Sequence, residues 1–229
     1  MDLSRAEALV GKVKMGRLKD ARVAVVGLGG VGSYIVEGLC RSGVGSLLLV
    51  DGDVYVSSNL NRQLGATMAT VGRSKVQVTL ERVRSINPEC WVQVYSEFYR
   101  PGDFGQVFAG RVDFVADAID DTAAKADLLT ECCRLGMPVI SVMGTGNKLH
   151  PELLQVTDIS KTQVCPLARS MRQRLRQAGI VSGVEVVYSP EVPQRAEHGA
   201  CSAPASMIFV PAAAGLLAAS RIVQRLMGE

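Results

Sequence analysis

A glycine-rich turn between an apolar run and a helical pattern is the feature that most constrains how this chain folds. The apolar run covers residues 23–26, and the turn after it has the pattern Gly-x-Gly-x-x-Gly, formed by Gly27, Gly29, Gly30 and Gly32. Such a turn lets backbone N–H groups approach a phosphate, and the positive end of the following helix dipole attracts it. The sequence therefore predicts a nucleotide-binding protein.

An acidic pair follows the next apolar run and supports this prediction. Residues 46–50 form that run, which ends at Asp51-Gly52-Asp53. A carboxylate after the second strand of a dinucleotide-type fold accepts hydrogen bonds from ribose hydroxyls. Asp51 and Asp53 are therefore candidate nucleotide-binding residues.

Composition limits the class of protein. The chain has 229 residues, 48% of them hydrophobic, which suits one globular domain. The six cysteines include no Cys-x-x-Cys pair, which favours reduced thiols over a zinc cage or a disulfide framework. The longest apolar run, residues 207–219, is shorter than the roughly 20 residues of a membrane span and predicts a buried C-terminal helix. We expect a soluble, cytoplasmic protein with no membrane partner.

Predicted strands alternate with predicted helices along most of the chain. Further strands are expected at residues 90–95, 112–116, 139–142, 153–156 and 184–188, and helices at 31–42, 74–86, 122–135 and 166–178. This alternation predicts an α/β fold with a doubly wound, mainly parallel, Rossmann-like sheet. We expect residues 1–144 to form the nucleotide-binding part with an N-terminal dimer segment. Residues 145–229 would be a substrate-side extension and C-terminal helix of the same domain.

Three polar segments should meet at one edge of that sheet. They are residues 27–32, 51–63 and 117–121, each of which follows a predicted parallel strand. Ligands of open α/β sheets bind beyond the carboxyl ends of the strands. The sequence therefore predicts a single crevice lined by all three segments.

The charged residues near this crevice distinguish between nucleotides. The diphosphate of NAD is bound largely by backbone amides, whereas cations such as Arg62 and Lys75 suit a triphosphate that loses pyrophosphate. One carboxylate among Asp117, Asp120 and Asp121 suits Mg²⁺. An NAD-dependent oxidoreductase and a non-catalytic nucleotide-binding module remain alternatives.

Each of these polar residues also has a purely structural interpretation. Asn59 and Asn61 can close a turn, Arg62 can be a solvated surface charge, and Asp117 can cap the following helix. Taken together, the set favours a site that binds a triphosphate whose α-phosphorus is attacked.

These residues carry a resemblance to a known family. The set resembles the motif of the ThiF/MoeB superfamily of adenylating enzymes, relatives of the ubiquitin-activating enzymes: Asp51, Asp53, Asn59, Asn61, Arg62, Gln63, Lys75, Asp117 and Asp120. Residues 147–148, 156–162 and 209–215 are similar to the TcdA-type branch, the tRNA threonylcarbamoyladenosine dehydratases. That branch implies an ATP-driven dehydration, in which the threonylcarbamoyl carboxylate is adenylated and an internal nitrogen closes a ring. Such an intramolecular closure needs no protein nucleophile.

The resemblance also implies roles for individual residues. Gly27, Gly29 and Gly32 would admit the ATP phosphates, Asp51 would bind the ribose with Asn59 nearby, Arg62 and Lys75 would contact the phosphates, and Asp120 would bind magnesium. Gly30, Asp53, Asn61 and Gln63 belong to the same nucleotide-binding set. Arg5 lies where the family places an arginine that reaches the partner subunit's phosphates, which implies a homodimer.

An arginine stripe offers a surface for the tRNA. On the helix predicted at 166–178, Arg169, Arg172 and Arg176 fall on one face without an acidic residue among them, and Lys161 precedes the helix. Such a stripe suits RNA phosphates, although a solvated helix face has the same pattern.

Several partners stay open. Activation of a sulphur-carrier or ubiquitin-like protein, with Cys165 or Cys201 as acyl acceptor, is the main alternative, although the zinc-type Cys-x-x-Cys pairs of those branches are missing. A sulphur-transfer partner protein and a monovalent cation near the loop after Gly144 are further possibilities.

Overall fold

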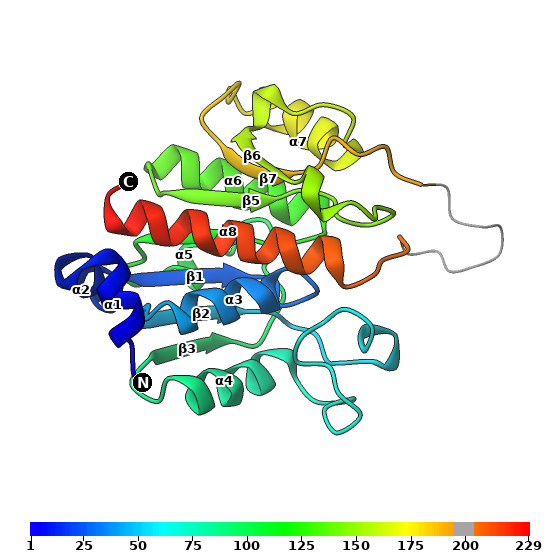
Figure 1. Cartoon of the computed structure of the whole chain (residues 1–229). Helices are drawn as coiled ribbons and strands as arrows, with labels where there is room; N and C mark the ends of the chain where they lie inside the picture. Colours follow the sequence, from blue (N-terminus) through cyan, green and yellow to red (C-terminus); the bar gives the residue numbers. More distant parts are fainter. Residues whose placement is uncertain (195–203) are drawn as a thin grey trace.

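Seven strands form one sheet in the order β3-β2-β1-β4-β5-β7-β6 in the computed structural model, which describes residues 1–194 and 204–229 (Figure 1). The strands are β1 Arg22–Val26, β2 Ser46–Val50, β3 Trp91–Tyr95, β4 Phe114–Asp117, β5 Val139–Val142, β6 Gln155–Asp158 and β7 Glu185–Tyr188. All neighbouring pairs are parallel except β6 with β7, which is antiparallel. The doubly wound, mainly parallel α/β fold predicted from the sequence is confirmed.

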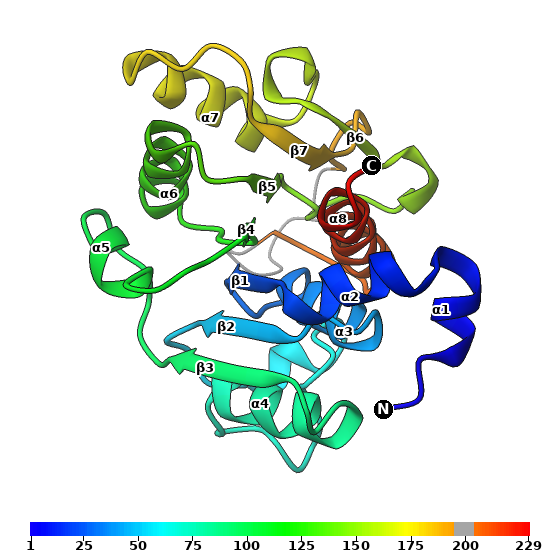
Figure 2. The ribbon, with the colours of Figure 1, turned by 90° about the vertical axis from the view of Figure 1, so that its left-hand side faces the viewer.

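Helices cover both faces of the sheet, which is why the central strands are apolar throughout (Figure 2). In β1, Val23 and Val25 face one cluster of buried side chains, and Ala24 and Val26 face another. The first cluster contains residues of α3 Gly32–Arg41, α4 Lys75–Ile86 and α8 Phe209–Met227. The opposite face is covered by α5 Phe104–Val107, α6 Thr122–Leu135 and α7 Pro166–Gln177.

Two N-terminal helices, α1 Ser4–Val10 and α2 Lys12–Asp20, were not predicted. No residue of α1 is buried, and α2 buries only Met15 and Leu18, which pack against Met227 at the other end of the chain. Helices this short depend on tertiary contacts rather than on their own periodicity. For the same reason the four-residue helix α5 gave no signal.

The second part of the chain differs from the prediction in detail. The strand expected at 153–156 begins two residues later, because residues Pro151–Leu153 form a 3₁₀ turn (η2). The buried C-terminal helix is confirmed as α8 and extends to Met227. Strands β6 and β7 join the sheet formed by the first part, and the division at residue 144 stays a prediction.

Residues 195–203, which include Cys201, lie outside the described part of the chain. Among the helices that the structure describes, none combines the length and the apolar character that crossing a bilayer requires.

Candidate active site

A cavity of about 660 Å³ lies at the carboxyl ends of β1, β2 and β4. Its lining includes Gly27, Gly29, Gly30, Asp51, Asp53, Arg62, Gln63, Lys75, Asp120 and Asp121. The three polar segments expected to meet at this edge of the sheet therefore do line one cavity.

The glycine turn is held close to the start of α3 and to the end of β2. A side-chain carbon at Gly32 would lie 1.7 Å from the carbonyl oxygen of Gly27, so only glycine fits where α3 begins. The backbone N–H of Leu28 donates to Oδ2 of Asp51 at 2.6 Å. Gly32 itself is not part of the cavity lining, so its role is to allow this close packing.

The two acidic residues after β2 have different surroundings. Asp51 is buried, and its Oδ1 accepts a hydrogen bond of 2.8 Å from the backbone of Asp53. Asp53 is about half exposed and lies 2.7 Å from the ammonium of Lys75. Partial burial raises the pKa of Asp53, but its hydrogen bonds with Lys75 and the backbone of Val54, together with the charge of Lys75, lower the pKa overall. Both carboxylates are therefore positioned as hydrogen-bond acceptors at the cavity.

Two cations line the cavity beside these carboxylates. Lys75 begins α4 and is only 6% exposed, so its ammonium is held in place. Arg62 donates from Nη1 to the carbonyl of Ser58 at 2.8 Å and to Oδ1 of Asn61 at 2.9 Å. Both of these partners are neutral, which leaves the positive charge of Arg62 uncompensated by them. This pair of cations suits an anionic ligand.

The neighbouring polar residues mostly form hydrogen bonds within the protein or pack beside the cavity. Asn59 is buried, and its Oδ1 accepts from the backbone of Val56 at 3.2 Å, which closes the 3₁₀ turn η1, Ser57–Asn59. Neither Asn59 nor Asn61 belongs to the cavity lining. Gln63 does, and its buried Oε1 has no hydrogen-bond partner within the described residues.

The end of β4 contains a buried ion pair that the sequence analysis missed. Asp117 and Lys125 are both fully buried, and the Nζ–Oδ2 distance is 2.9 Å. Ser141 donates to the same Asp117 oxygen at 2.6 Å, and Lys125 also donates to the carbonyl of Ile119 at 3.0 Å. The pair therefore fixes the turn that leads to Asp120. The signal in the sequence that could have indicated this pair is a single lysine on an apolar helix face, between Ala124 and Leu128.

The cap of α6 is Asp121, not Asp117. Oδ1 of Asp121 accepts hydrogen bonds from the backbones of Ala123 and Ala124 at 3.0 and 2.8 Å. The alternative interpretation of Asp117 as a helix cap is therefore wrong. Asp117 is fully buried and does not line the cavity, whereas the exposed Asp120 does.

The fit of a magnesium ion depends on the nucleotide. No group of three or more His, Cys, Asp or Glu residues in the described ranges is arranged to hold a metal ion. Asp120 offers one carboxylate, and Mg²⁺ commonly binds through one or two carboxylates together with substrate phosphates. Asp120 therefore fits magnesium that arrives with a triphosphate.

Arg5 lies far from this cavity within one chain. It belongs to α1, which lies at the end of the sheet where β1 begins, whereas the cavity is at the end where β1 stops (Figure 1). A contribution of Arg5 to the site requires a second subunit and stays a prediction.

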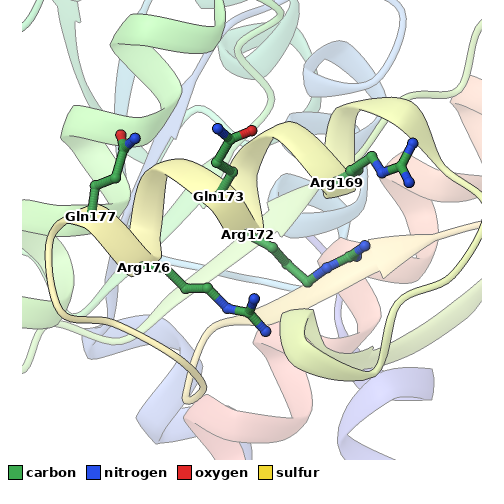
Figure 3. A pocket seen from close by; sticks show the side chains of 5 residues that line it. All are labelled: Arg169, Arg172, Gln173, Arg176 and Gln177. Carbon is green, nitrogen blue, oxygen red and sulfur yellow. The ribbon is translucent and has the colours of Figure 1, made fainter.

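The predicted arginine stripe forms a shallow hollow on α7. Arg169, Arg172 and Arg176 line it together with Gln173 and Gln177 (Figure 3). Arg172 is partly buried and donates from Nη1 to the carbonyl and the hydroxyl of Thr162, while Arg169 and Arg176 are exposed. No described carboxylate forms an ion pair with these arginines. Lys161 is exposed and ends the 3₁₀ turn η3, Ile159–Lys161.

Cys165 is 1% exposed and packs with Met143, Ala168 and Met171. An acyl acceptor must reach its substrate, so this burial argues against Cys165 in that role. Cys201, the other candidate, lies outside the residues that the structure describes.

The fold and the cavity define a class: α/β proteins that bind an anionic nucleotide at the carboxyl edge of a doubly wound sheet. The ThiF family model matches residues 3–229. The chain therefore belongs to the ThiF family.

Individual relatives support a narrower similarity. The tRNA threonylcarbamoyladenosine dehydratase of Bacillus subtilis (strain 168) is 42% identical over 99% of this chain and 94% of its own length. Crystal structures of the Escherichia coli tRNA N6-threonylcarbamoyladenosine dehydratase in complex with AMP and with ATP both superpose with a TM-score of 0.91. In each case the identity is 34% and the match covers 98% of this chain and 93% of the other. The resemblance expected from the sequence motifs is confirmed.

Proposed function

We propose that this chain is an ATP-dependent tRNA threonylcarbamoyladenosine dehydratase. The observation that carries the proposal is the pair of cations, Arg62 and Lys75, lining one cavity with the glycine turn and Asp51. The similarity to dehydratases over nearly the whole chain supplies the substrate class. The NAD-dependent alternative has no need of these cations, because backbone amides suffice for a dinucleotide diphosphate.

The proposed reaction has two steps. A carboxylate oxygen of the threonylcarbamoyl group attacks the α-phosphorus of ATP, and the bond to pyrophosphate breaks. Arg62 and Lys75 stabilise the negative charge that develops on the departing pyrophosphate. An internal nitrogen of the same group then attacks the activated acyl carbon and expels AMP. The oxygen lost from the nucleoside therefore leaves on AMP.

The protein's other residues would prepare these steps. Asp51 would accept hydrogen bonds from the ribose, Gly27 and Gly29 would let the backbone approach the phosphates, and Asp120 would hold magnesium. That ion, when bound, supplies further positive charge to the phosphates. Because ring closure is intramolecular, the enzyme needs only to activate the carboxylate and exclude water.

Assembly and location form a further part of the proposal. A homodimer would bring Arg5 of one subunit to the phosphates of the other. The proposal places the enzyme in the cytoplasm, where it would meet tRNA and ATP. A sulphur-transfer partner protein and a monovalent cation near the loop after Gly144 stay predictions.

The substrate assay tests the proposal directly. We expect purified protein, ATP, Mg²⁺ and tRNA carrying the uncyclised nucleoside to release AMP, with one nucleoside losing the mass of one water. AMP release that depends on a small carrier protein, with no mass change in the tRNA, would instead indicate a carrier-activating enzyme. Tight NADH binding without ATP binding would indicate an oxidoreductase. ATP binding without turnover under any condition would leave a binding module.

The α7 arginines, together with Lys161, would bind phosphates of the tRNA. Changing Arg169, Arg172 and Arg176 together to alanine should weaken tRNA binding and reduce the slope of log affinity against log salt by about 2 to 3 units, because each lost phosphate contact removes roughly one unit or slightly less. The expected measurement is tRNA affinity over a series of salt concentrations.

A matched control changes Arg41, Arg111 and Arg134 to alanine. Each is exposed and paired with a nearby carboxylate, so this variant loses the same charge elsewhere on the surface. It should keep the original slope. An unchanged slope in the α7 variant would count against this surface.

A further inference from the structure

The order of the strands gives the cavity two sides. Strands β2 and β3 lie on one side of β1, and β4 and β5 lie on the other. Asp51 and residues 98–101 line the first side. Because the ribose-binding carboxylate follows the second strand in folds of this type, the nucleoside of ATP belongs to the β2–β3 side. The second reactant must then approach from the β4–β5 side.

The β4–β5 side is a wall built from two distant segments. Thr145 and Gly146, which follow β5, line the cavity there, as do Pro204 and Ser206, which precede α8. A side-chain carbon at Gly146 would lie 2.7 Å from Cβ of Pro204. Such a distance is far inside van der Waals contact, so this wall requires glycine at position 146.

Asn147 joins the two segments and has an unusual backbone conformation. Its φ is 60°, in the left-handed region that asparagine tolerates better than most residues. Its N–H donates to the carbonyl of Ala205 at 2.7 Å, and its Oδ1 accepts from the N–H of Ala205 at 2.8 Å. Its carbonyl accepts from the N–H of Gln194 at 2.7 Å. One residue therefore ties the loop after β5 to two other segments.

A second asparagine connects the wall to the cation site. Nδ2 of Asn61 donates to the carbonyl of Ser206 at 2.8 Å, and its Oδ1 accepts from Arg62 at 2.9 Å. The sequence motif grouped Asn61 with the nucleotide-binding residues. Its contacts link the segment 204–206 to the guanidinium that would bind phosphate, and a nucleotide contact of Asn61 stays a prediction.

We propose that Asn147 is a positioning residue for the acyl substrate: it holds residues 145–146 and 204–206 together as the wall against which the carboxyl-bearing nucleoside of the tRNA docks. This inference rests on the proposed function, since it names the binding side of the second reactant. The inference places ATP on one side of the cavity and the acyl substrate on the other. The affinities for ATP and for the tRNA should therefore respond separately to a change in the wall.

Two substitutions at Asn147 separate its backbone from its side chain. Asn147→Gly keeps access to positive φ but removes the Oδ1 acceptor, whereas Asn147→Asp keeps that acceptor and also tolerates the left-handed region. We expect Asn147→Gly to raise KM for the tRNA by about 3- to 10-fold, as for one exposed hydrogen bond, with the ATP dissociation constant within about 2-fold of wild type. Asn147→Asp should restore KM to within about 3-fold of wild type.

Gly146→Ala is an independent variant of the same wall. The added methyl group must displace Pro204, so KM for the tRNA should rise while ATP affinity is retained. Gly16→Ala in α2 is the matched control, because a side-chain carbon there has no neighbour within 4 Å. It should leave both constants unchanged. Thermal unfolding of every variant checks that the fold is intact.

The results distinguish failure of the proposed function from failure of the positioning role of Asn147. If wild-type protein performs no dehydration, the proposed function fails. If wild type is active and Asn147→Gly keeps its KM for tRNA, or loses ATP affinity to the same degree, the positioning role is wrong. If KM for the tRNA rises as much in Asn147→Asp as in Asn147→Gly, the role of the Oδ1 hydrogen bond is wrong.

Discussion

Replacing Lys75 with methionine should lower kcat for tRNA dehydration by about 100- to 1,000-fold, the range seen when one preorganised charge stabiliser is removed. Lys75 is nearly buried at the start of α4, lines the cavity, and is held 2.7 Å from Asp53. Its ammonium is therefore held in place without a ligand, and under the proposed function it would stabilise the departing pyrophosphate. Arg62→Ala should act in the same direction.

Arg73 provides the control for this prediction. It lies two residues before Lys75, is exposed, pairs with Glu81, and does not line the cavity. Arg73→Ala should therefore keep the rate of wild type. The measurements are ATP–pyrophosphate exchange in the presence of modified tRNA, and tRNA affinity. If Lys75→Met abolishes tRNA binding while exchange continues at the wild-type rate, the assignment of this lysine is wrong.

Replacing Lys125 with methionine should reduce the free energy of unfolding by about 3–5 kcal/mol. The change leaves the carboxylate of Asp117 fully buried without its cation, and the desolvation of that charge is then no longer offset. Ser141 and the backbone N–H of Ile119 still donate hydrogen bonds to this carboxylate, but two neutral donors are too little to replace an ion pair. Denaturant unfolding monitored by circular dichroism gives the value.

Two further variants test whether the loss of stability comes from the unpaired buried charge. The double change Asp117→Asn with Lys125→Met removes both charges and should recover part of the loss, because no unpaired charge remains. Lys14→Met breaks a solvent-exposed pair with Glu229 and should cost less than about 1 kcal/mol. A loss under 1 kcal/mol in Lys125→Met would show that the buried pair is not needed for stability.

The sequence predicted the parts of the fold that have a local signal. Apolar runs such as residues 46–50 and the glycine turn at 27–32 mark strands and a helix start directly. The rule that ligands lie at the carboxyl edge of parallel strands then predicted the cavity. The helices α1 and α2 were missed because their stability comes from contacts with the C-terminal end of the chain.

The missed features of the site are contacts between residues of different elements. Lys125 meets the strand-end residue Asp117, and Asn147 meets Ala205. Neither pair has a spacing that a single sequence reveals, because the partners are brought together only by the folded sheet. Asn61 was placed in the right region, but its bond to Ser206 could not be predicted for the same reason.

If the protein activates a carboxylate as an acyl-adenylate, an oxygen atom of that carboxylate must leave with AMP. The protein and ATP are incubated with tRNA whose threonylcarbamoyl carboxylate carries ¹⁸O. The masses of the products are then measured by mass spectrometry. We expect one ¹⁸O atom in the phosphate of AMP for each nucleoside cyclised. Cyclisation that leaves AMP unlabelled, or that releases ADP instead, would contradict this mechanism.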